Sequence, residues 1–317
     1  MDKSNATARG CTNNADLRAA FETYRETFER TKDSYPGINA AAMALELGER
    51  GEMLRLAQQV LLLLGGARVE ELDHWKLATF GEAYLLLSDL DNAKKWYGKA
   101  VAYCPECHQD IAVMRRQARR NLEKLGLERN TLDSVLDVPR VAAFTGHMLD
   151  APGRATPRFP ADKVGAVRKA IAECLKKHEI GYGFSSAARG SDLIFIEELK
   201  NISGRPRVFL PFPREQFKKT SVGYGWDERF ERALKELEVV ELSQELPPED
   251  KQPEAYAGCN RKLLEEAIAK AKLLDEEPLL ITVWNGNPGD GAGGTADAVR
   301  EWRNEGHPLE IIDISKL

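Results

Sequence analysis

The 317-residue sequence is short of cysteine and of long apolar runs, and each shortage excludes a class of protein. Its five cysteines are an odd number scattered along the chain, which argues against a disulfide framework and predicts reduced thiols in a cytoplasmic protein. Its apolar runs, such as residues 60–64, fall far short of the roughly 20 residues of a membrane-spanning helix. Residues 1–14 are polar, so we expect a disordered N-terminus without the apolar core of a signal peptide.

The chain also lacks an excess of positive charge. Its formal net charge is −5, which argues against a general nucleic-acid binder. Hydrophobic residues make up 43% of the chain and charged residues 30%, which is typical of globular proteins. A chain of this length accommodates two domains, each with its own core. We therefore expect a two-domain cytoplasmic protein that binds neither nucleic acid nor a membrane.

Residues 15–130 show helical periodicity and no convincing strand. Leu17, Phe21, Tyr24 and Phe28 recur at spacings of three and four, which predicts one apolar face of an amphipathic helix. The Tyr-Pro-Gly sequence at 35–37 predicts a break before the second helix. Further helices are expected at 38–47, 52–64 and 110–125.

Six small and aromatic residues fall on the positions of a tetratricopeptide repeat of about 34 residues. The small ones let two antiparallel helices approach closely, the tyrosines fill the space beside them, and the proline ends the second helix. We expect an irregular stack of about three helix pairs around this repeat. The six residues are Gly81, Tyr84, Ala93, Tyr97, Ala100 and Pro105.

Residues 104–108, Cys-Pro-Glu-Cys-His, match the sequence pattern of a thiol-redox or haem-attachment motif. Pro105 already has a role as the helix-stop proline of the repeat, and no second cysteine pair accompanies it. We therefore interpret this stretch as the end of the repeat.

After residue 132, β-rich runs alternate with helical ones, which predicts a doubly wound, mostly parallel Rossmann-like sheet over residues 138–317. The fold class is thus α + α/β, with the domain boundary in residues 131–140. The expected strands are 140–144, 181–184, 207–210, 239–242, 279–284 and 309–314. The expected helices are 162–178, 191–202, 226–237, 254–274 and 296–304.

The stretch from Trp284 to Asp297 is the most informative in the chain. A buried strand breaks into five glycines and then a helix begins, which leaves backbone N–H groups around a helix N-terminus, a place suited to a phosphate. Asp290 and Asp297 would repel a bare phosphate and suit ribose hydroxyls, a base edge or a metal-bridged phosphate better. The loop therefore predicts a nucleotide-type ligand.

Other residues of the predicted site follow the remaining strands, because ligands of open parallel sheets bind outside the carboxyl ends of the strands. Four of these ends carry small, hydroxylated or charged residues, although strand ends also need turn residues. The predicted ligand-binding residues are Thr145, Gly146, His147, Ser185, Ser186, Arg189, Gly190, Asp192, Pro211, Arg214, Trp284, Gly286, Asp290, Gly293, Gly294, Thr295 and Asp297.

Several of these side chains have two interpretations. Arg189 and Arg214 are phosphate partners or solvated surface arginines. Asp192 holds a ribose, or it is an ordinary first-turn carboxylate facing the helix dipole. His147 is an acid–base group or an exposed loop histidine. The serines donate to a phosphate or cap the following helix.

Two parts of the sequence resemble known families. Residues 35–41, Tyr-Pro-Gly-Ile-Asn-Ala-Ala, with the repeat that ends at Pro105, resemble the tetratricopeptide-containing TRAFs-binding regulatory region of apoptosis signal-regulating kinases and its bacterial relatives. The second half resembles a Rossmann-like domain of the SLOG and TIR-like group that accompanies such repeats in bacteria. Its matching motifs are 145–150, 185–192, 210–212, 220–222 and 289–297. The resemblance implies binding, and in some members cleavage, of nucleotides or nucleotide sugars.

These observations lead to a primary hypothesis and two alternatives. In the first, the sheet domain senses a nucleotide or nucleotide-derived ligand, and the repeats bind a protein partner or a second copy of the chain. In the second, the protein cleaves an N-glycosidic bond of NAD or a nucleoside, with Glu197 or Glu198 as the catalytic carboxylate. In the third, it is an interaction scaffold. No cofactor and no metal is predicted.

Overall fold

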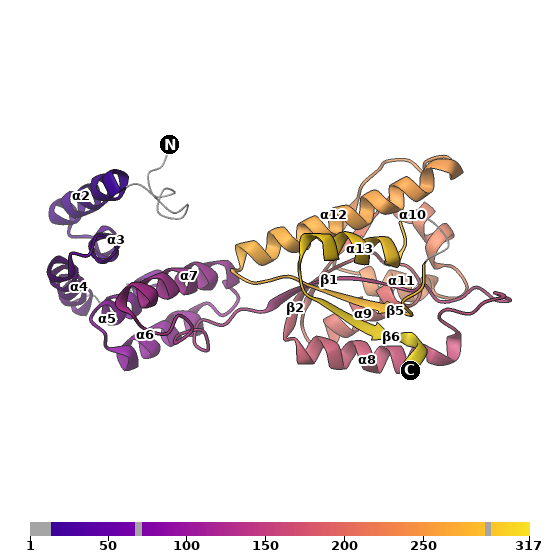
Figure 1. Cartoon of the computed structure of the whole chain (residues 1–317), viewed down its shortest axis with the longest axis horizontal. Helices are drawn as coiled ribbons and strands as arrows, with labels where there is room; N and C mark the ends of the chain where they lie inside the picture. The colour runs from indigo at the N-terminus through magenta and orange to yellow at the C-terminus, as the bar shows by residue number, and fades with distance from the viewer. Residues whose placement is uncertain (1–13, 67–71, 289–292) are drawn as a thin grey trace. The chain divides into compact units, whose positions relative to one another are not determined.

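The computed structural model describes residues 14–66, 72–288 and 293–317. The chain divides into two compact units, Met1–Val138 and Pro139–Leu317, and each has its own apolar core. The first consists of helices and the second contains a six-stranded parallel sheet, which confirms the predicted α + α/β fold class (Figure 1). In the described ranges no helix combines the length and apolarity needed to span a membrane.

The helical unit is a stack of antiparallel helices (Figure 1, indigo to magenta). Aspartates at the caps of three helices fix where these begin, because the side chains of Asp33, Asp73 and Asp89 accept hydrogen bonds from backbone N–H groups of the first turns. The helices are α2 (Asn14–Thr31), α3 (Ser34–Glu46), α4 (Arg50–Gly65), α5 (His74–Leu86), α6 (Leu90–Tyr103) and α7 (His108–Leu125).

Helices α5 and α6 form the predicted repeat. A β-carbon at Gly81 would lie 2.8 Å from the ring of Tyr97, so only glycine lets the two helices approach this closely. Ala93 and Ala100 are fully buried in the same contact. Gly37 of α3 is packed as closely, because a β-carbon there would lie 2.7 Å from the ring of Phe28 in α2 and 2.8 Å from Val60 in α4. The helical-repeat prediction is therefore confirmed.

The predicted break at residues 35–37 is wrong. Helix α3 begins at Ser34, and the Asp33 carboxylate accepts a hydrogen bond from the backbone N–H of Tyr35 at 3.0 Å. Pro36 stands in the first turn, where a helix tolerates a residue without an N–H donor. The Tyr-Pro-Gly sequence thus starts this helix.

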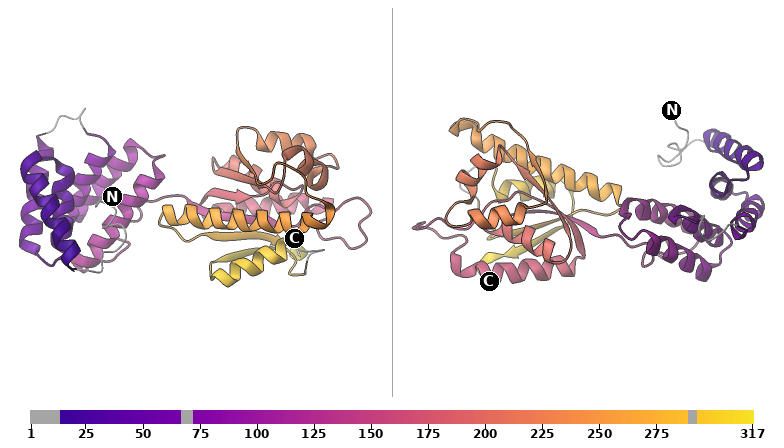
Figure 2. Two further views of the ribbon diagram at one scale, coloured as in Figure 1. Left: turned by 90° about the horizontal axis from the view of Figure 1, so that it is seen from above. Right: turned by 180° about the vertical axis from the view of Figure 1, so that it is seen from behind.

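The α/β unit contains six parallel strands in the order β4-β3-β2-β1-β5-β6. Helices α8, α9 and α11 cover one face, and α12 and α13 cover the other (Figures 1 and 2). The strands are β1 (Arg140–Gly146), β2 (Ile180–Ser185), β3 (Arg205–Leu210), β4 (Glu238–Glu241), β5 (Leu279–Trp284) and β6 (Leu309–Asp313). The helices are α8 (Val164–Lys177), α9 (Ser191–Asn201), α11 (Asp227–Leu234), α12 (Gln252–Leu273) and α13 (Thr295–Glu305).

One segment of the α/β unit was not predicted. Between β3 and α11 the chain forms a single helical turn, α10 (Arg214–Phe217), that continues into a π-helical turn, η3 (Lys218–Val222). Phe217 and Val222 are buried in the core of the unit, so these turns are part of its packing. They place residues 217–221 at the carboxyl edge of the sheet.

The expectation of reduced cysteines is wrong for one pair. Cys104 and Cys107 form a disulfide, with their Cα atoms 5.4 Å apart. A separation of three residues between the end of α6 and the start of α7 brings the two side chains together. Cys174 and Cys259 are buried free thiols, and Cys11 lies outside the described residues.

Candidate functional site

The order of the strands determines where a crevice opens. β1 pairs with β2 on one side and with β5 on the other. After β1 the chain adds β2, β3 and β4 on the first side, and after β5 it adds β6 on the second side. The loops that leave β1 and β5 therefore diverge, which is the switch point where open α/β sheets bind ligands. The backbone N–H of His147 still donates to Val283 O at 2.9 Å, so the crevice opens directly after this residue.

A cavity of about 380 Å³ lies at this switch point. It contains residues that follow β1, β2 and β5, so three of the four predicted strand ends meet there. The predicted site residues among its walls are Thr145, Gly146, His147, Ser186, Asp192, Trp284, Gly293, Gly294 and Thr295.

Asp192 is a buried carboxylate in the first turn of α9, and its side chain faces this cavity. It is 7% exposed, its Oδ2 accepts a hydrogen bond from Ala188 N at 3.3 Å, and its Oδ1 has no partner among the described residues. Burial raises the pKa of Asp192 to about 7. An unpaired buried carboxylate oxygen is costly, so Oδ1 of Asp192 is a candidate to accept a hydrogen bond from a ligand.

His147 is buried beside the same cavity and joins the ends of β1 and β5. Its Nε2 lies 3.0 Å from Oδ1 of Asn285, and that oxygen also accepts a hydrogen bond from the backbone N–H of Asn287 at 3.1 Å. Burial lowers the pKa of His147, although the Asn285 hydrogen bond opposes this. Burial thus favours the neutral imidazole, and His147 is not the exposed loop histidine of the second interpretation.

Two helices begin at the cavity, α9 at Ser191 and α13 at Thr295. Two glycines allow α9 to begin close to the end of β1. A β-carbon at Gly146 would lie 2.4 Å from Ser191 Oγ, and Gly190 has a φ of +102°, which favours glycine. The N-terminal ends of both helices carry partial positive charge, and Arg158 contributes a full one to the wall. This side of the cavity favours an anion.

The end of the glycine loop is held in place by α12 and α13. Gly293 has a φ of +81°, and a β-carbon there would lie 2.8 Å from the backbone nitrogen of Ala257. Its carbonyl accepts a hydrogen bond from Asn260 Nδ2 at 2.7 Å, and its N–H donates to Asp297 Oδ2 at 2.8 Å. Asp297 thus stabilises the end of the loop by binding the Gly293 backbone, and it is not among the residues that line the cavity. Asp290, with the rest of 289–292, lies outside the described residues.

The wall of the cavity also carries a cluster of hydroxyl groups. Ser221 Oγ lies 2.8 Å from the hydroxyl of Tyr256, and Thr220 Oγ1 lies 3.2 Å from it. Thr220 and Ser221 belong to η3, whereas Tyr256 belongs to α12. Such groups both donate and accept hydrogen bonds, so the cluster suits a ligand rich in hydroxyls or amides.

Sequence reasoning did not place several residues of the wall. The motif at 220–222 was a usable signal, because it belonged to the resemblance. Nothing in the sequence marked Tyr256 or Asn260, which lie in the middle of a helical pattern and not after a strand. The missed residues with functional groups or large side chains are Met148, Arg158, Phe217, Thr220, Ser221, Tyr256 and Asn260.

Both predicted arginines are engaged elsewhere. Arg189 is buried; its Nε donates to Leu149 O and its Nη1 to Val222 O, each at 3.0 Å. It therefore ties the loop after β1 to η3. Arg214 forms an ion pair with Glu231. Neither is among the residues that line the cavity.

The remaining predicted residues after β2, β3 and β5 also lie outside the lining. Ser185 is buried, and its hydroxyl has no partner among the described residues. Pro211 is buried after β3. Gly286 is exposed, and its φ of +82° marks it as a turn residue.

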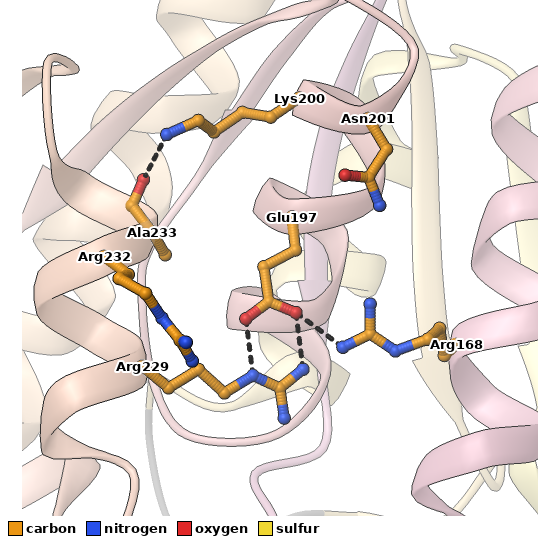
Figure 3. Close-up of a pocket in the computed structure, with 7 residues that line it drawn as sticks. All are labelled: Arg168, Glu197, Lys200, Asn201, Arg229, Arg232 and Ala233. Atoms are coloured by element: carbon orange, nitrogen blue, oxygen red, sulfur yellow. Dashed lines mark hydrogen bonds and ion pairs between the residues drawn. The ribbon is translucent and has the colours of Figure 1, made fainter.

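The two candidate catalytic carboxylates lie away from the cavity. Glu197 faces a separate hollow between α8, α9 and α11, where it pairs with Arg229 and Arg168 (Figure 3). Although burial opposes the effect, hydrogen bonds from the two arginines lower the pKa of Glu197. Glu198 also pairs with Arg168. A carboxylate held ionised by arginines is poorly suited to act as a base.

Comparisons with known proteins assign no family to the chain. No family model matches it, and no curated protein sequence matches it. Among solved structures, a point mutant of the O-GlcNAc transferase from Thermobaculum terrenum is similar at 13% sequence identity. The match covers 98% of this chain and 72% of that one, with a TM-score of 0.27. A similarity this weak assigns neither a family nor an activity.

Proposed function

We propose that this is a regulatory protein whose α/β unit binds a nucleotide or nucleotide-derived ligand in the switch-point cavity. The helical unit would bind a protein partner or a second copy of the chain. One observation carries the ligand proposal: Oδ1 of Asp192 is buried beside the cavity and has no hydrogen-bond partner in the part of the chain that the structure describes. A buried acceptor without a partner is stabilised when a ligand donates a hydrogen bond to it.

The walls suggest how such a ligand would lie. A phosphate would sit near the N-termini of α9 and α13 and beside Arg158. A ribose hydroxyl or a base N–H would donate to Asp192. The hydroxyls of Ser221 and Tyr256 would bind further polar groups, and the ring of Trp284 would pack against a base. With its pKa of about 7, Asp192 tolerates a nearby phosphate when it is protonated and accepts a ribose hydroxyl when it is ionised.

The resemblances extend this proposal to a biological role. A SLOG or TIR-like domain fused to a TRAFs-binding-like repeat region would belong to bacterial signalling. The two-unit architecture supports the same proposal, because a ligand-binding unit and a helical-repeat unit in one chain allow ligand to bias partner binding. The ligand proposal and the partner proposal are tested separately.

A thermal-shift screen of the full chain tests the ligand proposal, with nucleotides, NAD, ADP-ribose and cyclic dinucleotides as probes. A ligand that binds only the native state at 100 times its Kd stabilises it by about 2.7 kcal/mol. We expect a concentration-dependent rise in Tm that is lost in Asp192→Asn. The matched control is Asp162→Asn, the same change at an exposed aspartate of this unit. An equal rise in all three proteins would place the ligand elsewhere.

Product analysis of each hit separates sensing from catalysis. A ligand recovered intact supports the sensor, whereas release of nicotinamide or a free base would make the protein an N-glycosidic hydrolase. Glu197 and Glu198 lie outside the cavity, and Asp192 is the acidic residue among the described residues that line it. In the hydrolase alternative, Asp192 would therefore be the candidate general acid or base, a role that a pKa of about 7 suits. A screen without any hit would favour the interaction scaffold.

A further inference from the structure

Four residues with metal-binding side chains meet at one end of the helical unit, outside the proposed nucleotide site. His74 begins α5, Cys104 follows α6, Cys107 precedes α7, and Asp110 lies in the first turn of α7. His74 Nε2 lies 2.9 Å from Asp110 Oδ2. The ligand atoms of His74, Cys107 and Asp110 all lie within 4.8 Å of one another, and Cys104 is joined to Cys107 by the disulfide.

We propose that, once this disulfide is reduced, Cys104, Cys107, His74 and Asp110 bind one Zn²⁺ ion. Two thiolates, an imidazole and a carboxylate form a ligand set that zinc accepts in tetrahedral sites, and Cys-x₂-Cys is a common zinc-ligand spacing. Cys104, Cys107 and Asp110 come from the short stretch between α6 and the first turn of α7, and the start of α5 adds His74 to them.

The geometry fits zinc without a rearrangement of the backbone. The Cα atoms of Cys104 and Cys107 lie 5.4 Å apart, so both sulfurs can reach one ion at about 2.3 Å. The nitrogen of His74 and the oxygen of Asp110 would each lie about 2.0–2.2 Å from the ion. In a tetrahedron they would then be about 3.4 Å apart, so their present hydrogen bond has to open by only a few tenths of an ångström.

The surroundings favour binding. Cys107 stands at the N-cap of α7, where the helix dipole stabilises a thiolate. The imidazole of His74 stacks on Tyr103, with ring centroids 6.3 Å apart, which restrains its orientation. His74, Cys107 and Asp110 are all partly exposed, so an ion can enter from solvent.

A second cluster in the described part of the chain provides a contrast. Cys174, His178 and Glu310 also bring ligand atoms within 4.8 Å. Burial and the nearby Glu310 raise the pKa of the Cys174 thiol to about 12, and Lys177 already binds Glu310 at 2.9 Å. This cluster offers one thiol that resists ionisation, whereas the first offers a pair beside a helix N-terminus. Cys174 therefore serves as the control cysteine.

The disulfide makes the proposed zinc site dependent on redox state. A low-molecular-weight disulfide such as oxidised glutathione accepts two electrons from the two zinc-bound thiolates. Cys104 and Cys107 then form their S–S bond, and the small disulfide takes up two protons and leaves as two thiols. The zinc ion loses two of its four ligands and dissociates. Reduction restores the thiols, which release their protons when zinc binds again.

Metal titration of the full chain tests this proposal. The protein is reduced with a phosphine, stripped with a chelator and titrated with Zn²⁺, and then with Co²⁺ as a spectroscopic probe. We expect about one ion per chain, sulfur-to-cobalt charge-transfer absorption in the near ultraviolet, and visible bands of a tetrahedral site. Oxidised glutathione should release the zinc to a chromophoric indicator.

Variants identify the ligands. We expect Cys107→Ser to weaken zinc binding strongly and to reduce the charge-transfer band to at most that of one thiolate, because only Cys104 remains. His74→Gln should weaken zinc binding by about tenfold or more, while Cys174→Ser should bind like the unmodified chain. Circular dichroism checks that each variant remains helical. The proposal is overturned if the reduced unmodified chain binds no zinc, if it retains zinc after oxidation, or if Cys107→Ser binds as tightly as the unmodified chain. Loss of binding in Cys174→Ser would overturn the assignment as well.

Discussion

His147 Nε2 lies 3.0 Å from Asn285 Oδ1, and this contact joins the loops after β1 and β5 across 138 residues of sequence. It stands at the point where the strand order reverses, directly beside the cavity. The contact keeps the two strand ends together, while the loops beyond them separate. A contact between two residues distant in the sequence thus lies beside the proposed ligand site.

The buried carboxylate of Asp192 should make stability depend on pH. Burial raises its pKa to about 7 in the folded protein, whereas an unfolded aspartate has a pKa of about 3.9. Between these values the folded state holds a proton that the unfolded state lacks, so stability falls as pH rises through this window. We expect Asp192→Asn, which stays neutral, to be more stable than the unmodified chain at pH 8 by on the order of 2 kcal/mol.

Urea denaturation at pH 5 and pH 8 measures this difference. The advantage of Asp192→Asn should be smaller at pH 5 than at pH 8, because at pH 5 only the lower part of the window between the two pKa values has been crossed. Asp162→Asn, at an exposed position, should show no such change between the two pH values. A stability difference that is the same at both pH values would contradict the proposed protonation of Asp192.

Gly293 should tolerate alanine much less well than Gly286. Both have a positive φ, +81° and +82°, so alanine strains the backbone at each. Only at Gly293 does the new β-carbon also meet other atoms, with Ala257 N at 2.8 Å. We expect Gly286→Ala to cost about 1 kcal/mol and Gly293→Ala clearly more. Chemical denaturation compares them, and equal costs would show that the close approach to α12 is unimportant.

Alanine substitution at two glycines of the repeat should change the stability of the helical unit in opposite directions. A β-carbon at Gly81 would lie 2.8 Å from the Tyr97 ring, whereas at Gly98 it would make an ordinary contact of 3.7 Å with Val135. We expect Gly81→Ala to destabilise the helical unit by about 1–3 kcal/mol through overpacking. Gly98→Ala should stabilise it by about 0.5–1 kcal/mol through helix propensity. Thermal unfolding followed by circular dichroism checks both, and stabilisation by Gly81→Ala would contradict the observed packing.

Glu197→Gln should lower the stability of the protein slightly and leave ligand binding in the switch-point cavity unchanged. The change breaks the ion pairs with Arg168 and Arg229 in a partly exposed hollow, so we expect a loss of about 1 kcal/mol or less. Any ligand of the switch-point cavity should bind with unchanged affinity, as measured by calorimetry. A loss of turnover with unchanged folding would instead restore Glu197 as a catalytic residue of the hydrolase alternative.

Local patterns in the sequence determined the elements of this protein. The run 279–284 is apolar and was predicted with the same bounds as β5, and Gly81 and Tyr97 predicted the α5–α6 contact. These signals are local because periodicity, turn residues and small-residue spacing act over a few neighbouring positions. The Tyr-Pro-Gly sequence was misread for the same reason, since proline both breaks helices and begins them.

Only the tertiary structure decided which side chains share a site. Tyr256 and Asn260 reach the cavity because α12 crosses the sheet and begins at its carboxyl edge. Glu197 faces the hollow of α8 and α11, although it follows Asp192 by only about 1.4 turns of the same helix. Arg189 was expected at a ligand and instead binds two backbone carbonyls. Such outcomes depend on strand order, helix rotation and contacts between distant segments, and a local sequence pattern carries none of that information.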